Sequence, residues 1–441
     1  MLPEPAPERL TVDELRDVWS ALSAEERAEG FIVLARDEAG EFFQSLDPLG
    51  QAQILERVPP GEKRLWIRLL APDDVADVLQ ETDEEHRPEL LALLDETTRR
   101  EVNALMAYAE DDAGGLMSPR FARIRADMQV DEAIRYLQKQ GRSHLETIYY
   151  IYVLDSAQRL IGVVSFRDLF ASPPDKPVRE IMNPEPVAVR ADMDQEAVAA
   201  LFKQHSFLAL PVVDADGKMQ GIVTLDDIVD VVQEEATEDA QKFGGMEALD
   251  APYLQTGLWE MIKKRGGWLT LLFAGEMLTT GAMARYEDDI TKAVVLAVFI
   301  PLIISSGGNS GSQAATLVIR AMALGEVRLR DWTRIIRREI GAGFGLGMIL
   351  ALLGLSKILL WEFLFDSYGD HSGLLALTVG SSLVGVVLWG TIAGSMLPFI
   401  IRRFGFDPAS ASAPFVATLV DVSGLIIYFT AAQIFLGGTL L

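Results

Sequence analysis

Five long apolar runs dominate the second half of the chain. They cover residues 268–284, 293–323, 340–364, 374–401 and 415–436. Each run is long enough, as a helix, to cross the roughly 30 Å hydrocarbon core of a bilayer. The pattern therefore predicts an α-helical transmembrane domain with five spans in residues 258–441.

The first 115 residues show apolar positions at helical spacing, without the alternation that is typical of strands. Acidic residues and Pro or Gly mark the starts of short helices, as in Pro72-Asp73-Asp74. We expect an all-α superhelical N-terminal domain in residues 1–115. Asp73 and Asp77 are four residues apart and share a helix face, where like charges repel unless a cation lies between them. A solvated surface is the alternative interpretation of this pair.

Residues 116–230 contain an internal repeat. Leu-Met-Ser-Pro at 116–119 returns as Ile-Met-Asn-Pro at 181–184, and residues 162–169 return as 221–228. Each copy predicts helix, strand, turn, strand and helix, and resembles a CBS domain, so we expect α/β tandem CBS domains. In that family the Ser or Thr and the Asp after the second strand often hold an adenosine ribose. The resemblance implies this role for Ser165 with Asp168 and for Thr224 with Asp227, although these residues could instead cap the next helix.

Residues 231–257 are predicted to form an acidic connecting (plug) helix and a linker. The connection lies between the repeat and the apolar runs, so it is placed to transmit a change of state. Carboxylates at this membrane-proximal position are costly unless divalent cations neutralise them.

The net charge differs between the part of the chain that holds the apolar runs and the part that precedes them. Residues 250–441 carry 14 basic and 14 acidic side chains, so the whole excess of 25 negative charges lies in residues 1–249. This balance argues against nucleic acid as a partner and favours cations. The chain has no Cys, and its four His are too far apart in sequence to suggest a transition-metal site.

The segments that flank the apolar runs are alternately basic and acidic. Residues 263–265, 328–338 and 402–403 are rich in Lys or Arg, whereas the connections after the first and third runs are acidic. By the positive-inside rule, the N-terminal domains are cytosolic and the C-terminus is outside. We expect a multi-pass protein of the cell (inner or plasma) membrane, with membrane lipid as a partner.

The second apolar run is interrupted by small and polar residues. Pro301 is followed by Ser-Ser-Gly-Gly-Asn-Ser-Gly-Ser-Gln at 305–313. At membrane depth such a sequence indicates irregular backbone or close helix packing. The segment either lines an aqueous pathway or forms a glycine-rich packing seam.

Asp421 lies within the fifth run, and no Lys, Arg or His occurs in that run. A charged side chain near the bilayer centre costs roughly 2.5–3.5 kcal/mol and usually marks an ion or proton path. Glu276 in the first run is a competing candidate. A two-fold dimer would place two Asp421 carboxylates around one axis, an arrangement that suits Mg²⁺ better than Ca²⁺ because Mg²⁺ keeps much of its water.

Several motifs resemble the MgtE magnesium channels. They are Gly307-Gly308-Asn309-x-Gly311-x-Gln313, Ala417-Thr418-Leu419-x-Asp421-x-x-Gly424, and Glu235-Ala236-Thr237-Glu238-Asp239 after tandem CBS copies. The resemblance covers essentially the whole chain. It implies a homodimeric Mg²⁺-selective channel for magnesium uptake, which is closed when cytosolic Mg²⁺ binds to the N and CBS domains.

The resemblance also implies individual site residues. Asp421 and the carbonyl of Ala417 would bind the pore ion, and the pore lining would be Pro301, Gly307, Gly308, Asn309, Gly311 and Gln313. The Mg²⁺ sensor would use Glu41, Asp73, Asp77, Asp194, Glu196, Asp227, Asp230, Glu235, Glu238 and Asp239. Ser206 stands where relatives usually carry Asp, so one sensor site is expected to be weaker or missing. ATP is left open as a regulatory ligand.

Two other functions compete with a channel. One is a secondary divalent-cation transporter coupled to H⁺ or Na⁺, which single-channel currents would distinguish. The other is a membrane sensor that reads nucleotide without transport, which leaves Asp421 and the Gly-Gly-Asn segment unexplained. The sequence contains no nucleophile–base motif and no Walker-type loop, so we do not expect an enzyme.

Overall fold

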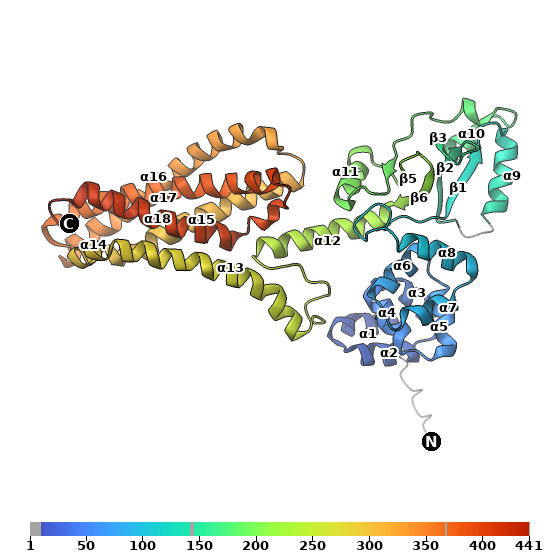
Figure 1. The fold of residues 1–441 in the computed structure, drawn as a ribbon, viewed down its shortest axis with the longest axis horizontal. Coiled ribbons are helices and arrows are strands. Elements are labelled where there is room, and N and C mark those ends of the chain that lie inside the picture. Colours follow the sequence, from blue (N-terminus) through green and yellow to red (C-terminus); the bar gives the residue numbers. More distant parts are fainter. Residues whose placement is uncertain (1–9, 142–144, 367, 441) are drawn as a thin grey trace, which may run out of the picture. The chain divides into compact units, whose positions relative to one another are not determined.

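The computed structural model describes residues 10–141, 145–366 and 368–440. The chain divides into two compact units, residues 1–235 and 236–441. Figure 1 shows the helices and strands of each unit. We describe the two units separately.

The first unit begins with a stack of short helices, as the helical spacing predicted. Thr11 and Ser23 start the first two α-helices through capping boxes with Glu14 and Glu26. The helices pack around an aromatic core in which the rings of Phe31 and Trp66 meet edge to face, with centroids 4.9 Å apart. The elements are α1 (Val12–Val18), η1 (Trp19–Ala21), α2 (Ala24–Val33), α3 (Arg36–Gln44), α4 (Pro48–Arg57), α5 (Pro60–Ile67), α6 (Pro72–Glu81), α7 (Arg87–Leu93) and α8 (Glu96–Leu105).

The internal repeat folds as two similar three-stranded sheets. In each sheet the middle strand pairs in parallel with the first strand and antiparallel with the third. The first copy is β1 (Phe121–Arg125), α9 (Val130–Gln140), β2 (Thr147–Leu154), β3 (Leu160–Ser165) and α10 (Phe166–Ala171), followed by η2 (Val178–Glu180). The second copy is β4 (Val189–Arg190), α11 (Gln195–His205), β5 (Ala209–Val213), β6 (Met219–Thr224) and α12 (Leu225–Phe243). The predicted order is found, with a short additional strand at the start of each copy.

The second unit is a bundle of long helices. They are α13 (Leu258–Arg285), α14 (Glu287–Lys292), α15 (Val295–Ala323), α16 (Trp332–Phe365), α17 (Ser372–Arg403) and α18 (Ala413–Leu436), with short turns η3 (Leu329–Asp331), η4 (Gly369–His371) and η5 (Pro408–Ser410). The five apolar runs are therefore all helical.

Within the part of the chain that the structure describes, four helical segments are long and apolar enough to cross a membrane by length and composition. They are 295–323, 329–365, 372–403 and 413–436. Helix α13 has 28 residues but carries the acidic Glu276 in its middle and is not among them. The fifth span therefore stays a prediction.

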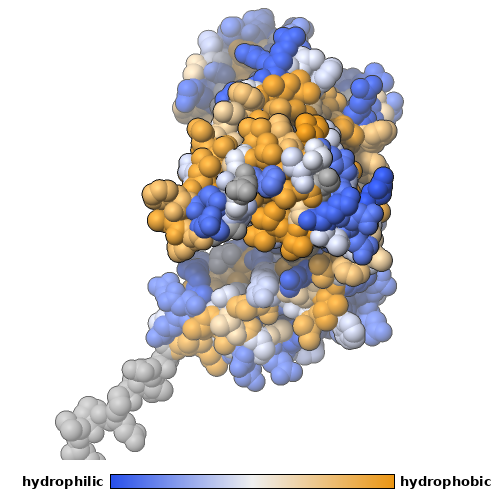
Figure 2. Space-filling view, turned by 90° about the vertical axis from the view of Figure 1, so that its left-hand side faces the viewer, coloured by the Kyte–Doolittle hydropathy of each residue, from blue (hydrophilic) through white to orange (hydrophobic). Residues whose placement is uncertain are grey.

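Apolar side chains cover much of the bundle surface. Figure 2 faces the end of this unit that carries α14, where orange apolar surface is interrupted by blue hydrophilic patches. Phe273, Leu317 and Phe363 are among the large apolar side chains that are more than two-thirds exposed. Such a surface is unfavourable in water, and it is expected where lipid or another protein chain covers the helices.

Candidate functional site

Helix α15 is continuous through Pro301 and the glycine-rich segment. Of the two alternatives that the sequence left open, the structure therefore has close helix packing and not irregular backbone. A Cβ atom on Gly311 would lie 2.9 Å from the carbonyl oxygen of Gly390, and a Cβ on Gly394 would overlap the carbonyl oxygen of Gly311. Gly307 and Gly311 thus form a seam against Gly390 and Gly394 of α17, which lets two helix backbones meet.

A second face of α15 is polar and exposed. Pro301, Ser305, Asn309 and Gln313 are spaced four residues apart, and all four are exposed in the single chain. Residues at this spacing follow one ridge of a helix. The Asn309 amide donates to the Ser305 hydroxyl at 3.4 Å. The glycine-rich segment therefore combines a buried packing seam with an exposed polar stripe.

Asp421 lies beside this segment, on α18. Its side chain is half-buried, and a Cβ atom added to Gly308 would lie 3.8 Å from Asp421 Oδ1 and 3.6 Å from the Cα of Ala417. Asp421, Ala417 and Gly308 therefore meet at one contact between α15 and α18. Helix α18 contains no Lys, Arg or His that could pair with the carboxylate. This leaves an intramembrane carboxylate next to a polar helix face.

A carboxylate cluster forms in the first unit between α6 and the start of α12. Asp73 is 8% exposed, and no described residue donates a hydrogen bond to its Oδ1 atom. Its electrostatic neighbours are Glu146, Asp74 and Asp227. A buried carboxylate oxygen without a partner, surrounded by other carboxylates, is a favourable ligand set for a hard cation.

Burial raises the pKa values of these carboxyl groups, and the neighbouring negative charges raise several of them further. The pKa of Asp73 lies well above its usual range, and that of Asp77 rises to about 8. Burial also raises the pKa of Asp227 to about 7, although Thr224 partly offsets this by hydrogen bonding to the carboxylate. At neutral pH the cluster therefore competes with protons for any cation that it binds.

The sequence-predicted sensor residues fall into separate groups. Asp73, Asp77 and Asp227 belong to the cluster, whereas Glu41 is exposed on α3. Asp194 caps α11 by accepting from the N–H of Glu196 at 2.9 Å. Of the α12 residues, Asp230 is exposed, Glu235 accepts a 2.8 Å hydrogen bond from Gln195, and Glu238 and Asp239 lie in the second unit.

Sequence reasoning missed Asp74, Asp226 and Glu146, which act electrostatically on the cluster. The sequence could have indicated Asp74 and Asp226, because Asp73-Asp74 and Asp226-Asp227 are acidic pairs at helix starts. Ser206 is the exposed αL residue that ends α11, with φ of 54°.

The end of α12 is held by an ion pair inside the second unit. Lys242 Nζ lies 2.8 Å from Asp407 Oδ2, in the connection between α17 and α18, and also pairs with Glu238. Burial, followed by the nearby Asp407, raises the pKa of Asp239. Carboxylates of the acidic helix thus lie next to a connection between two membrane-spanning helices.

Of the predicted nucleotide-binding residues, Ser165 serves as a helix cap in this structure. Ser165 Oγ accepts from the N–H of Asp168 at 3.0 Å and donates to its carboxylate at 2.7 Å. Thr224 donates to Asp227 at 2.7 Å. Thr224 also lines a cleft of about 590 Å³ that includes Glu146 and Asp226. These carboxylates would repel nucleotide phosphates unless a cation bound between them.

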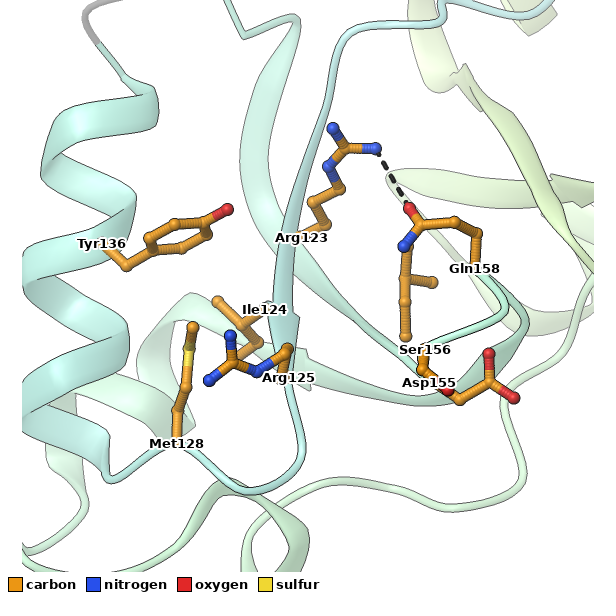
Figure 3. A pocket seen from close by; sticks show the side chains of 9 residues that line it. Arg123, Ile124, Arg125, Met128, Tyr136, Asp155, Ser156 and Gln158 are labelled. Atoms are coloured by element: carbon orange, nitrogen blue, oxygen red, sulfur yellow. Dashed lines mark hydrogen bonds between the residues drawn. The ribbon is translucent and has the colours of Figure 1, made fainter.

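A smaller cleft of about 220 Å³ lies at the end of β1. Figure 3 shows Arg123 donating to Gln158 at 3.3 Å, with Tyr136 of α9 on the other side of β1. Arg125, which also lines this cleft, is paired with Asp127. None of the predicted nucleotide-binding residues lines this cleft.

One His lies near carboxylates, which sequence spacing did not indicate. His86, Glu56 and Asp83 place possible ligand atoms within 4.8 Å of one another. His86 and Asp83 are exposed, and Glu56 pairs with Arg57 at 3.2 Å. The group is therefore an open surface arrangement.

Comparisons with known proteins agree with this architecture. Residues 300–431 match a family model described as a divalent cation transporter, residues 10–111 match an MgtE intracellular N domain, and residues 113–174 and 178–234 match CBS domains.

Full-length relatives match almost the whole chain. The magnesium transporter MgtE of Thermus thermophilus is 41% identical, and the match covers 97% of this chain and 94% of that protein. The MgtE of Enterococcus faecalis is 32% identical, with 92% and 93% covered. The solved cytosolic domain of an MgtE Mg²⁺ channel in complex with ATP is 44% identical over 51% of this chain and 91% of that chain, with a TM-score of 0.47. The chain therefore belongs to the MgtE family of magnesium transporters, and is a multi-pass membrane protein rather than an enzyme.

Proposed function

We propose that this protein is a Mg²⁺-selective channel for magnesium uptake, in which Asp421 binds the permeating ion. The observation that carries the proposal is the contact of Asp421 with Gly308, beside the exposed polar ridge of α15 and without a basic partner in α18. In a two-fold homodimer, two such ridges and two Asp421 carboxylates would face one axis. A wet lumen with few carboxylates suits Mg²⁺, which retains most of its hydration shell.

We further propose that cytosolic Mg²⁺ closes the channel by binding to the cluster around Asp73, Asp77 and Asp227. Without cations, these carboxyl groups must either bind protons or repel one another as carboxylates, and either cost opposes the packing of α6 against the start of α12. A bound Mg²⁺ removes this cost and favours the packed arrangement. Helix α12 begins at this cluster and ends at the Lys242–Asp407 pair, so it can carry the change toward the membrane helices.

The number of Mg²⁺ sites that closure requires can be estimated. A site with a dissociation constant near 1 mM, present only in the closed form, contributes about 1.4 kcal/mol toward closure at ~10 mM Mg²⁺. Switching from mostly open to mostly closed takes roughly 5.5 kcal/mol, and hence about four sites. Removal of one site should therefore weaken closure without abolishing it.

In this arrangement residues 1–235 face the cytosol, where the sensor reads Mg²⁺, and the C-terminus lies outside. Membrane lipid would cover the apolar faces of the bundle. ATP is a proposed regulatory ligand, because the cytosolic domain of a relative is described in complex with it. Binding of ATP to the full-length chain should weaken in Ser165→Ala and Asp168→Ala if these residues contact the ribose.

The deciding experiment is patch-clamp recording of the purified protein in liposomes, with wild type compared with Asp421→Ala. We expect discrete Mg²⁺ openings that need Asp421 and become rare as Mg²⁺ on the sensor side is stepped from zero to ~10 mM. Flux without unitary currents, driven by an imposed H⁺ or Na⁺ gradient, would instead establish a coupled transporter.

A further inference from the structure

Glu276 of α13 is a second acidic side chain close to Asp421. The two carboxylates act on each other electrostatically. Residues 266–284 of α13 contain no Lys, Arg or His, and neither does α18. Two adjacent carboxylates without a basic residue in either helix segment need another source of positive charge.

The two helices are parallel and keep a constant register. A Cβ atom on Gly275 would lie 2.9 Å from Cγ2 of Thr418, and further along the ring of Tyr286 stacks on that of Phe429 with centroids 4.5 Å apart. Eleven residues separate the two contacts on either helix. Asp421 is therefore level with residue 278, about 3 Å along the helix axis from Glu276.

Helix rotation brings both carboxylates to the same side of this contact. Each residue turns a helix by about 100°, so Glu276 lies about 100° from Gly275, while Asp421 lies about 60° in the opposite sense from Thr418. Gly275 and Thr418 face each other across the two parallel helices. A rotation in one sense from Gly275 and in the opposite sense from Thr418 therefore leads to the same side of the helix pair. On α18 this is also the flank that meets Gly308 of α15. Glu276, which is exposed in the single chain, and half-buried Asp421 therefore lie on the same flank of the contact between α13 and α18.

Thr279 adds a buried hydroxyl to this flank. It is 8% exposed, and no described residue makes a hydrogen bond with its Oγ1 atom. Thr279 follows Gly275 by four residues, so it lies about 40° from Gly275, between Gly275 and Glu276 in angle. Its hydroxyl is thus available to a water molecule between the two helices.

A hydrated Mg²⁺ ion has the size that this arrangement requires. Its water oxygens lie about 2.1 Å from the metal, and a hydrogen bond adds about 2.7 Å. Two carboxylates that bind opposite sides of the hydration shell can therefore be as much as ~9 Å apart. Neighbouring parallel helices, with axes about 8–10 Å apart, place flanking side chains within this range.

We propose that Glu276 and the Thr279 hydroxyl hold the hydration shell of the divalent cation bound at Asp421. The inference rests on the proposed role of Asp421 as the pore-ion ligand. It adds α13 to the ion-binding site, and it explains why an acidic residue lies in the middle of the apolar run of residues 268–284. The ligand is a hydrated divalent cation, with Mg²⁺ as the probe.

The test compares Glu276→Gln, Glu276→Asp, Thr279→Val and Asp421→Asn by Mg²⁺ flux into liposomes over a range of external Mg²⁺. Glu260→Gln is the matched control, because Glu260 is a partly exposed carboxylate in the first turn of the same helix, about 24 Å from Glu276. We expect Glu276→Gln to raise the half-saturating Mg²⁺ roughly tenfold and Thr279→Val roughly fivefold. Glu276→Asp should recover most of the affinity, and the control should match wild type.

The outcomes separate this inference from the proposed function. If Asp421→Asn abolishes flux while Glu276→Gln matches wild type, Glu276 is not part of the site and the channel proposal survives. If Asp421→Asn leaves flux intact, the channel proposal itself fails. An equal shift in Glu260→Gln would indicate a general surface-charge effect and overturn the inference. A change in the pH dependence of flux without a change in Mg²⁺ affinity would show that the carboxylates share a proton instead.

Discussion

Mg²⁺ binding to the cytosolic cluster should be strongly coupled to pH. Asp77 and Asp227 have pKa values raised to about 8 and about 7, chiefly by burial. Raising the pH from 6.5 to 8.5 increases the ionised fraction of Asp77 from about 3% to about 76%, and that of Asp227 from about 24% to about 97%. A Mg²⁺ ion that requires both carboxylates should therefore bind up to ~100-fold more tightly at pH 8.5, or about 25-fold if it requires Asp77 alone.

Isothermal titration calorimetry of the full-length protein in detergent provides the assay. Titrations in buffers of different ionisation enthalpy give the number of protons released for each Mg²⁺ bound. Asp77→Asn should reduce this release, because Asp73 and Asp227 still exchange protons, whereas the control Asp192→Asn should leave it unchanged. Asp192 is exposed, and its pKa is lowered by its hydrogen bond with Arg190, so it is already ionised over this range. A Mg²⁺ affinity that does not change between pH 6.5 and 8.5, with no proton release, would refute the reasoning.

Three further predictions concern stability. When a chelator removes divalent cations, the melting temperature of the protein should fall as the pH rises from 6 to 9. The reason is that carboxyl groups of the native cluster keep their protons in this range, whereas the same groups in the unfolded chain lose them near pH 4. Saturating Mg²⁺ should remove most of this fall in melting temperature. Asp73→Asn should stabilise the Mg²⁺-free protein by about 1–3 kcal/mol and reduce the stabilisation by Mg²⁺, both measured by thermal unfolding; a destabilised apo protein would contradict the burial argument. Gly394→Ala should destabilise the helix bundle by a few kcal/mol, measured as lost monodispersity on heating in detergent, while Gly345→Ala, which meets no atom within 4 Å, should behave as wild type.

Periodicity predicted the elements well because it depends on local sequence alone. The helical spacing of residues 1–115, the strand and helix order of the repeat, and the five apolar helices all follow from local patterns. The helix through Pro301 is the exception. Pro and several Gly disfavour a soluble helix, but tight packing of Gly307 and Gly311 on α17 compensates for the weak local preference.

The roles of individual site residues were harder to predict, because neighbouring residues on a helix face different partners. Gly307 and Gly308 are adjacent and chemically identical, yet Gly307 packs on Val386 of α17 and Gly308 faces Asp421 of α18. Likewise, Asp73 is buried and Asp74 is exposed. A rotation of about 100° between successive residues decides these roles, and only the tertiary packing fixes which side faces inward.

Helix α12 carries carboxylates near both of its ends and is stabilised by the charges of its own terminal turns. Asp226 and Asp227 lie in its first turn and Lys242 in its last turn, so charges of favourable sign occupy both ends of the helix dipole. The helix should therefore remain intact when the cluster around Asp73 gains or loses a cation. Its 19 residues span about 27 Å from Leu225 to Phe243. In the proposed mechanism, α12 is the element through which a change at the cluster would reach the membrane helices.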